Sequence, residues 1–400
     1  MTYLEELASR RRFGMRASLE GMEKVLAALG NPEKNVKAIH IAGTNGKGAV
    51  AAMLDSALRA CGFKVARYTS PHLVRLNERF FIQGEMASDA ILEEAASRVA
   101  AIAPEDLTFF EALTAVAYLV FAASDLDYAV IETGLGGRLD ATNVCRPSLS
   151  IITKIGLDHC DWLGDTEEKI AVEKGGIIKK GIPVLLGRNS PAVRETIRAI
   201  ASERSSRFVY APDLACAEEI PAGFSLKGAF NRENAVTALA ALKVLQAPER
   251  ALGGFSNVVW PGRYHRTGNF IIDGAHNPPA ASALASALAE DGERDLVLIA
   301  GFCADKDVDE TLLILKPFCK RAIAVKTNNP RSLEAETLSA RMRGLGFAAE
   351  SAPSLAKAIE MAGGASTLVC GSLFLAGEAL VALGAYPWPD IRFDPSETLK

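Results

Sequence analysis

Apolar positions along the first two thirds of the chain predict helices and strands in turn. Leu19, Met22 and Val25 recur at the spacing of one helical face, which predicts an early helix. Further helices are predicted at 49–61 and 112–123, and short apolar runs predict strands at 37–42, 128–132, 149–153 and 183–186. Strands that alternate with helices indicate a mostly parallel α/β sheet that is covered on both faces.

A second, smaller α/β unit is predicted near the C-terminus. Its strands are expected at 270–273, 296–300, 322–326 and 367–370, with helices such as 280–289 and 308–315. This pattern is typical of a Rossmann-like domain. We expect a first domain at 1–262, a second at 268–400 and a hinge at 255–267, where the sequence WPGRYHR lies. The tail from Pro387 is predicted to be irregular.

A glycine-rich turn joins the strand at 37–42 to the helix that follows. It comprises the residues Gly43, Thr44, Asn45, Gly46, Lys47 and Gly48. Glycines let backbone N–H groups approach a phosphate, the helix N-terminus adds partial positive charge, and Lys47 adds a full one. The common loop ends in Gly-Lys-Ser/Thr, with a glycine six residues before its lysine. Ile41 stands at that earlier position here, so the loop is a shortened variant and another residue must supply the hydroxyl that usually helps to hold Mg²⁺.

Composition narrows the class of protein. Of the 400 residues, 49% are apolar and 23% are charged, as in soluble globular proteins, and the length favours two domains. The net charge of −4 argues against a general nucleic-acid binder. The seven cysteines form no C-x-x-C pair and are predicted to be free thiols in a reducing compartment. With neither a signal-peptide pattern nor an apolar stretch long enough for a membrane, we expect a cytoplasmic protein.

Motifs along nearly the whole chain resemble those of the folylpolyglutamate synthase/dihydrofolate synthase family, in the Mur ligase superfamily. The motifs occur in the same order as in the family, so the whole set is far more specific than any single motif. After the loop GTNGKG come YTSPHL from Tyr68, NER from Asn77, TFFE from Thr108, ETGLGGRLDATN from Glu132, IGLDH from Ile155, LGDT from Leu163, EK from Glu173, WPGR from Trp260, DGAHNP from Asp273, DKD from Asp305 and GSL from Gly371.

The resemblance implies a fold and a reaction. The fold is an N-terminal P-loop-type ATPase domain with a mostly parallel sheet, plus a smaller C-terminal Rossmann-like α/β domain. In the reaction, ATP phosphorylates a substrate carboxylate and the amine of L-glutamate attacks the acyl phosphate. The implied acceptor is dihydropteroate or a reduced folate, with no nucleic acid or membrane partner, and a monomer is expected.

The resemblance also implies residues for ATP and metal. Beyond the loop, the ATP-binding positions are Ala49, Asn234, Arg263 and Asp273. The Mg²⁺-associated positions are Ser70, Glu132 and His159. Glu132 ends one predicted strand and His159 lies just beyond another, and both strand ends would open onto the crevice where α/β sheets bind ligands. A carboxylate and a hydroxyl suit Mg²⁺, whereas the histidine is less typical.

Catalytic roles are implied for Lys47, Lys174 and His276. Lys174 matches the lysine that the family carbamylates, although composition alone would favour an ordinary surface lysine in a charged helical run. His276 follows Asp273 in one loop and is expected near glutamate or the acyl phosphate, with a structural role as the alternative.

Two segments match the family's pterin-binding regions. They are Thr108, Phe109, Phe110 and Glu111 in the first, and Leu139, Asp140 and Ala141 in the second. Either phenylalanine could stack on a flat heterocycle, and at least one is expected to be core. Residues 13–15 are expected to cover the same pocket.

Three departures from the family pattern leave other functions open. Ala49 replaces a serine or threonine, Phe230-Asn231 replaces His-Gln, and Gly175 replaces an alanine. The loss of one hydroxyl hydrogen bond costs about 0.5–1.5 kcal/mol, so weaker rather than abolished ATP or Mg²⁺ binding is expected. The alternatives are another Mur-type amino-acid ligase and a non-catalytic nucleotide-binding paralogue. Whether the first glutamate, later ones or both are added stays open at this point.

Overall fold

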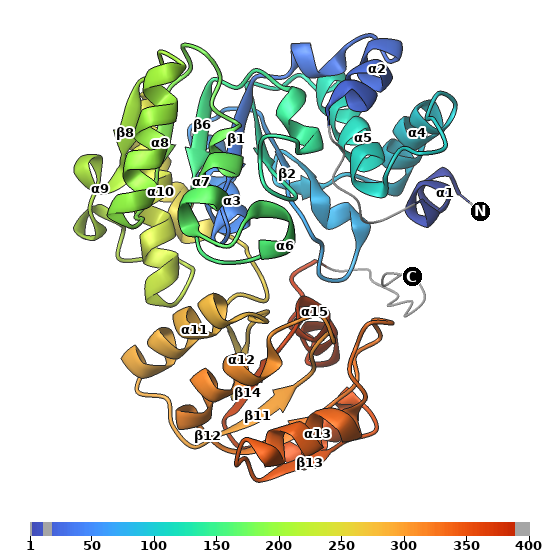
Figure 1. The fold of residues 1–400 in the computed structure, drawn as a ribbon, viewed down its shortest axis with the longest axis vertical. Coiled ribbons are helices and arrows are strands. Elements are labelled where there is room, and N and C mark those ends of the chain that lie inside the picture. Colours follow the sequence, from blue (N-terminus) through green and yellow to red (C-terminus); the bar gives the residue numbers. More distant parts are fainter. Residues whose placement is uncertain (1, 11–17, 389–400) are drawn as a thin grey trace. The chain divides into compact units, whose positions relative to one another are not determined.

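The computed structural model describes residues 2–10 and 18–388. The segment 13–15 and residues 389–400 of the tail, for which predictions were made, lie outside that part. The chain divides into two compact units. Unit 1 takes the described residues of Met1–His72, Leu76–Ser225 and Glu233–Val258, and unit 2 takes those of Leu73–Arg75, Leu226–Arg232 and Val259–Lys400. Each is an α/β unit, which confirms the predicted fold class (Figure 1).

Unit 1 is built on an eight-stranded sheet in the order β4-β3-β2-β5-β1-β6-β7-β8. Its strands are β1 (Ala38–Ala42), β2 (Val65–Tyr68), β3 (Phe80–Ile82), β4 (Glu85–Met86), β5 (Tyr128–Glu132), β6 (Leu149–Ile152), β7 (Val184–Leu186) and β8 (Phe208–Tyr210). The pairs from β2 to β8 are parallel, whereas β3 and β4 are antiparallel additions at one edge. The phosphate loop therefore leaves the sheet from a central strand.

Helices cover both faces of this sheet. The α-helices of unit 1 are α1 (Tyr3–Ser9), α2 (Glu20–Ala28), α3 (Lys47–Ala60), α4 (Asp89–Ala100), α5 (Phe109–Ala123), α6 (Cys160–Leu163), α7 (Glu167–Gly175), α8 (Pro191–Glu203), α9 (Ala211–Leu214) and α10 (Ala229–Val244), the last of which begins in unit 2. Short 3₁₀ helices are η1 (Pro32–Asn35), η2 (Leu76–Arg79), η3 (Ala141–Val144), η4 (Ala217–Glu219) and η5 (Glu249–Asn257).

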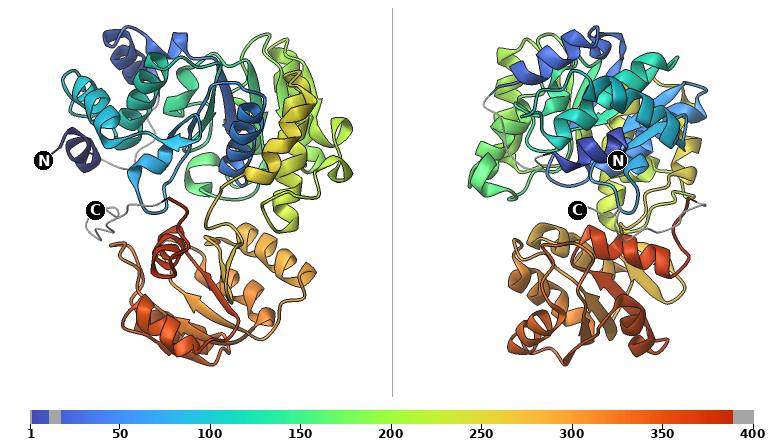
Figure 2. Two further views of the ribbon diagram at one scale, coloured as in Figure 1. Left: turned by 180° about the vertical axis from the view of Figure 1, so that it is seen from behind. Right: turned by 90° about the vertical axis from the view of Figure 1, so that its right-hand side faces the viewer.

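The core of unit 1 follows the alternation of side chains along its strands. Ala38 and Ile131 share one cluster with Val116 of α5, so α5 and α4 cover that face. Ile39 and Ile41 are equally buried but alternate with Ala38, so they point to the other face, where α3 lies against η5 (Figure 2). A strand buried on both faces explains the continuous apolar runs in the sequence.

Unit 2 has a six-stranded sheet in the order β13-β12-β11-β14-β10-β9, with only β9 antiparallel among its described strands. The strands are β9 (His265–Thr267), β10 (Phe270–Ile272), β11 (Leu296–Ala300), β12 (Cys319–Ala324), β13 (Ala349–Ser351) and β14 (Thr367–Cys370). The helices are α11 (Pro278–Glu290), α12 (Val308–Leu315), η6 (Lys316–Phe318), α13 (Ala335–Gly344), α14 (Leu355–Ala362) and α15 (Leu373–Ala382). Leu298 packs in the cluster of α11 to α13, whereas Val297 and Ile299 pack with α14 and α15.

The structure also bears on the cysteines and on possible membrane spans. All seven cysteines are free thiols, as predicted. In the part of the chain that the structure describes, no helix has the length and apolar character needed to cross a membrane.

Candidate active site

The phosphate loop lies between β1 and α3 and is fixed by the segment that follows β6. The backbone N–H groups of Thr44 and Asn45 donate to the carbonyl oxygen of Lys154, at 2.8 and 3.2 Å. The Thr44 hydroxyl bonds to the backbone of Gly156 at 3.0–3.1 Å. Because α3 begins at Lys47, the N–H groups of its first turn have no acceptor within the helix and can bind an anion.

Two glycines of the loop leave no room for a side chain. A Cβ at Gly43 would lie 1.8 Å from Oγ1 of Thr153. A Cβ at Gly46 would lie 2.2 Å from Oδ1 of Asn234, and Gly46 also has a left-handed φ of +87°. The structure therefore places Asn234, on α10, directly against the loop. Ala49 is buried in the first turn of α3.

Lys47, Glu132 and Ser70 meet at the carboxyl ends of neighbouring strands. The Lys47 Nζ lies 3.8 Å from Oε1 of Glu132, the last residue of β5. The other oxygen, Oε2, accepts the backbone N–H of Ser70 at 3.1 Å. Ser70 follows β2 and is partly exposed, whereas Glu132 is buried. We call Ser70, Glu132 and Lys47 the carboxylate corner.

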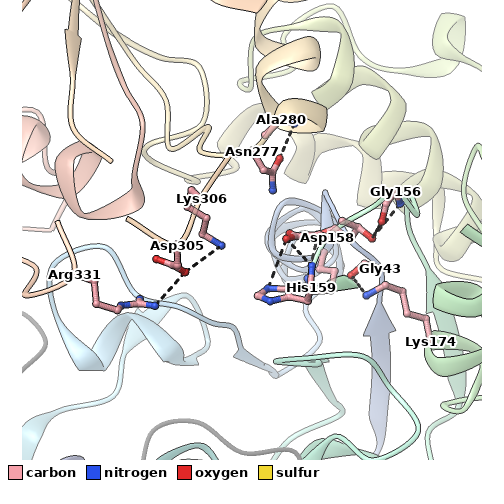
Figure 3. A network of polar contacts seen from close by, with 12 residues as sticks. Gly43, Gly156, Asp158, His159, Lys174, Asn277, Ala280, Asp305, Lys306 and Arg331 are labelled. Carbon is pink, nitrogen blue, oxygen red and sulfur yellow. Dashed lines mark hydrogen bonds and ion pairs between the residues drawn. The ribbon is translucent and has the colours of Figure 1, made fainter. Parts of the chain in front are cut away.

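Lys174 reaches the same loop from α7. Its Nζ donates to the carbonyl oxygen of Gly43 at 2.8 Å, and Figure 3 shows the two residues side by side. The side chain is buried, and that burial, with the positive charge of Lys47, lowers the pKa of Lys174 to about 7. Lys174 is thus an interior group and not the surface lysine that composition alone would favour, and its burial disfavours the charged form.

His159 lies at the N-terminus of α6 with a left-handed φ of 52°. Its side chain is about half exposed, and its Nε2 lies 3.9 Å from Oδ1 of Asp158. In the described ranges, no group of three His, Cys, Asp or Glu side chains is arranged as a metal site. The carboxylate corner nevertheless offers oxygen donors, the chemistry that Mg²⁺ prefers.

The loop after β5 is organised by Asp140. One carboxylate oxygen accepts the backbone N–H of Leu135 at 2.8 Å, and the other accepts the N–H of Thr142 at 3.0 Å and its hydroxyl at 2.5 Å. Burial raises the pKa of Asp140, and these hydrogen bonds lower it. A Cβ at Gly137 would lie 2.8 Å from the carbonyl oxygen of Lys174, so the loop packs directly on α7. Asp140 and Ala141 are buried, and Leu139 is partly exposed.

The TFFE segment forms the start of α5. Thr108 and Glu111 cap the helix reciprocally: Glu111 N–H donates to the Thr108 hydroxyl at 3.2 Å, and Thr108 N–H donates to the Glu111 carboxylate at 2.8 Å. Phe109 is buried in the core, whereas Phe110 is partly exposed. A Cβ at Gly134 would lie 2.5 Å from Cζ of Phe110, so the ring covers the backbone just after β5.

In unit 2, Arg263, Asp273 and His276 come together around β10. Both oxygens of the buried Asp273 accept backbone N–H groups at 2.7 Å, from Tyr264 and Ala275. Burial raises the pKa of Asp273, which Arg263 opposes. The Arg263 guanidinium passes over Gly274, where a Cβ would lie 2.7 Å from one of its nitrogens. His276 Nδ1 lies 2.8 Å from the carbonyl oxygen of Gly274.

No function was predicted from the sequence for a cluster of charged side chains in unit 2. Arg331 and Lys306 both pair with Asp305, at 3.4 and 4.0 Å (Figure 3). Asp305 and Lys306 follow β11, and Arg331 follows β12, so the cluster lies beyond the carboxyl ends of parallel neighbours. The DKD motif could have identified Lys306 as a site residue from the sequence, whereas Arg331 belongs to no motif.

The chain matches known protein families and curated relatives. Residues 41–211 match the model of the Mur ligase middle domain, and residues 262–373 match that of the Mur ligase, glutamate ligase domain. A curated relative from Bacillus subtilis, named dihydrofolate synthase/folylpolyglutamate synthase, is 36% identical over 319 residues, which cover 70% of this chain and 74% of the relative.

Solved structures are similar over almost the full length. Folylpolyglutamate synthase of Mycobacterium tuberculosis, complexed with ADP, has a TM-score of 0.88 and 31% identity, covering 96% of this chain and 99% of that one. A bifunctional folylpolyglutamate synthase/dihydrofolate synthase with Mn, AMPPNP and L-glutamate bound has a TM-score of 0.82 and 31% identity, covering 96% of each chain.

Proposed function

Because this chain belongs to the dihydrofolate synthase/folylpolyglutamate synthase family of Mur ligases, we propose that it joins L-glutamate to the carboxylate of dihydropteroate or a reduced folate. It is an ATP-dependent ligase. The proposed reaction passes the γ-phosphoryl group of ATP to the acyl carboxylate. The glutamate amine then attacks the acyl carbon, an amide forms and phosphate leaves.

The observation that carries this proposal is the convergence of Lys47 and Lys174 on the phosphate loop beside Glu132. Acyl-phosphate formation brings the negative charges of ATP and a carboxylate together, so it requires fixed positive groups and good alignment. We assign the β- and γ-phosphates to Lys47 and to the N–H groups of Gly46 to Ala49, because those of Thr44 and Asn45 already donate to Lys154. Asn234 and Arg263 are assigned to the nucleotide as well.

Ser70 and Glu132 would hold Mg²⁺ through a hydroxyl and a carboxylate, with His159 as a further candidate. When bound, the metal supplies compensation for the charge on the transferred phosphoryl group. The position of the Glu132 carboxylate would determine where the metal binds. One of its oxygens accepts the N–H of Ser70, and the other faces Lys47.

Lys174 is proposed to be carbamylated. A neutral amine attacks CO₂, a C–N bond forms and one proton is released, which leaves an anionic carbamate on Nζ. With its pKa at about 7, Lys174 is half neutral at pH 7, whereas a lysine near 10.4 is almost wholly protonated. Since the modification also converts a buried cation next to Lys47 into an anion, it would relieve the repulsion between them.

For unit 2, we propose that Lys306 and Arg331 bind a carboxylate of glutamate. Both cationic side chains lie beside Asp305, at 4.0 and 3.4 Å, beyond the carboxyl ends of β11 and β12. Asp273, which was assigned to the ribose from the resemblance, and His276 would act near the nucleotide and the glutamate amine. We further propose domains at 1–262 and 268–400 with a hinge at 255–267, and a monomeric, cytoplasmic enzyme.

The test is phosphate release by purified protein with ATP, Mg²⁺ and L-glutamate, with dihydropteroate or tetrahydrofolate as the acceptor. Stimulation by dihydropteroate alone would indicate a dihydrofolate synthase, and stimulation by both acceptors a bifunctional enzyme. Lys47→Met should abolish release, whereas Lys154→Met, an exposed lysine beside the same loop, should leave it intact. ATP binding with no release for either acceptor would instead favour the non-catalytic paralogue.

A further inference from the structure

Arg79 is a buried arginine for which the proposed reaction has so far needed no role. It ends η2 and precedes β3, and its carbonyl oxygen accepts the N–H of Thr69 at 3.1 Å. That bond fixes Arg79 across from the residue before Ser70, close to the carboxylate corner. Its side chain is only about 5% exposed. A charge so deeply buried is costly unless it is paired or binds an anion.

The groups in direct contact with the Arg79 side chain are aromatic and polar, and two carboxylates act on it electrostatically. Its Nε–H donates to Nδ1 of His72 at 2.9 Å, and its guanidinium lies 5.5 Å from the ring centroid of Phe109. The Tyr68 hydroxyl hydrogen-bonds to the same side chain. Within residues 2–10 and 18–388, no carboxylate forms an ion pair with Arg79. Burial lowers the pKa of Arg79, while Tyr68, Glu78 and Glu132 raise it, so Glu132 is near enough to interact electrostatically.

Other cations of this region already have partners. Arg67 is equally buried, but it forms an ion pair with Asp55 at 3.3 Å. Lys174 bonds to the phosphate loop, and Lys47 faces Glu132. Arg79 therefore lies between the aromatic start of α5 and the carboxylate corner, and it forms no ion pair with a carboxylate of the described residues.

An acyl substrate of this enzyme has the matching chemistry. Dihydropteroate is a flat heterocycle joined to a benzoate, and its carboxylate is the group that must be phosphorylated. The partly exposed Phe110, which covers Gly134 and lies 6.2 Å from the Tyr68 ring, offers an aromatic surface for the flat part. Partly exposed Ser70 and exposed Gly134 give a ligand access to this corner. A guanidinium binds a carboxylate through two parallel hydrogen bonds, which also fixes its orientation.

We propose that Arg79 binds the carboxylate of the acyl substrate and holds it at the carboxylate corner for phosphoryl transfer. His72 orients the guanidinium from the Nε side and Tyr68 holds it as well, so the ligand would bind to the remaining N–H groups of the terminal nitrogens. This inference rests on the proposed function, because it assumes that dihydropteroate or a folate is the acyl substrate.

The test measures equilibrium binding of two probes to the full-length chain without ATP: dihydropteroate and its uncharged carboxamide. We expect the wild type to prefer the carboxylate. Arg79→Met should weaken dihydropteroate binding by about 10- to 100-fold and carboxamide binding by less than about threefold, since only the charged hydrogen bonds are lost. Arg79→Lys keeps the charge but not the fork, and it should give an intermediate affinity. Affinity for AMPPNP should be unchanged in both variants.

The outcomes separate this inference from the proposed function. Equal weakening of both probes in Arg79→Met, or in Arg79→Lys if the first variant does not fold, would mean that Arg79 only supports the structure and would overturn the inference. Binding of neither probe by the wild type would overturn the proposed acceptor itself. Arg67→Lys is the matched control, because it changes a buried arginine that is already paired: it should lower stability without altering the preference for the carboxylate.

Discussion

Three glycines of unit 1 show two different reasons why a position requires glycine: a left-handed φ, or too little space for a Cβ atom. Gly62 has a left-handed φ of +83° but open space around it. Gly137 has no such φ, yet a Cβ there would meet the backbone of Lys174 at 2.8–3.0 Å. Gly46 meets both demands at once, with φ +87° and Asn234 at 2.2 Å. The close approach at Gly46 therefore comes from the packing of Asn234 against the loop, and not merely from a turn.

Gly46→Ala and Gly62→Ala should differ in function more than in stability. Each alanine adopts a left-handed φ, which costs about 1–2 kcal/mol of unfolding free energy. Only Gly46→Ala also displaces Asn234 and the loop, so we expect the KM for ATP to rise about tenfold or more there and to stay unchanged in Gly62→Ala. The measurements are thermal unfolding and steady-state kinetics. An equal KM for ATP in the two variants would contradict the contact.

The low pKa of Lys174 makes stability depend on pH in a defined direction. Between about pH 7 and 10.5 the unfolded chain holds a proton on Lys174 that the folded chain has released, so the free energy of unfolding should rise as pH rises through this range. Below pH 7 both states are protonated and the dependence disappears. In CO₂-free buffer we expect the wild type to gain about 2 kcal/mol from pH 7 to pH 9 relative to Lys174→Met.

Urea unfolding at the two pH values measures that difference. Lys169→Met, on the exposed side of the same helix, is the control and should show the wild-type increase. If Lys174→Met gained as much stability as the wild type between pH 7 and 9, Lys174 would have an ordinary pKa. Repeating the experiment with bicarbonate should reduce the difference, because a carbamate no longer takes up that proton.

At the scale of elements, the sequence predicted the central strands well and the edges poorly. β1, β5, β6 and β11 are continuous apolar runs because both of their faces are buried. β2 was missed because Arg67 interrupts its pattern, and its charge is compensated by Asp55 on α3, which no local pattern reveals. The strands β3, β4 and β9 are two or three residues long and depend on pairing with a neighbour.

The candidate site was predictable where the motif adjoins a strand end, as at Lys47 and Glu132. It was not predictable where tertiary contacts decide the role. The burial of Lys174, the contact of Asn234 with Gly46 and the two backbone N–H groups on Asp273 all join residues distant in the sequence. Thr108 and Glu111 show the opposite case, since their spacing of three residues is itself a helix-capping pattern that a functional reading passed over.

The start of α5 gives a prediction that separates capping from ligand binding. Thr108→Ala removes the acceptor for Glu111 N–H, so we expect the free energy of unfolding to fall by about 1–2 kcal/mol and Thr108→Ser to restore it. Ser88→Ala, at the exposed N-cap of α4, is the matched control and should cost about 0.5–1 kcal/mol. Chemical unfolding with parallel dihydropteroate kinetics tests this. A raised KM in Thr108→Ala with unchanged stability would argue against the cap.

For the whole molecule, the division into units does not follow the order of the sequence. Unit 1 is interrupted by Leu73–Arg75 and Leu226–Arg232, both of which belong to unit 2. Leu73 and Val74 are buried in the cluster that includes Ile272 of β10 and Ala376 of α15. Leu76, only three residues after Leu73, packs instead against the core cluster of unit 1. Neighbouring leucines in one short segment therefore stabilise different units.

Leu73→Ala and Leu76→Ala should accordingly loosen different parts of the chain. Truncation of a well-buried leucine costs about 2–5 kcal/mol, and the partly exposed Leu76 should cost less. Amide hydrogen exchange in native conditions provides the measurement, because it reports local stability segment by segment. We expect Leu73→Ala to accelerate exchange in β10, β14 and α15 while β1 and β5 keep their protection, and Leu76→Ala to affect unit 1 alone. Faster exchange in β1 and β5 of Leu73→Ala, with β10 unaffected, would show instead that Leu73 stabilises unit 1.

If Leu73→Ala affects only unit 2 and Leu76→Ala only unit 1, residues 259–400 expressed alone would lack part of the core of unit 2. An isolated C-terminal fragment should then be less stable than the same residues in the full chain.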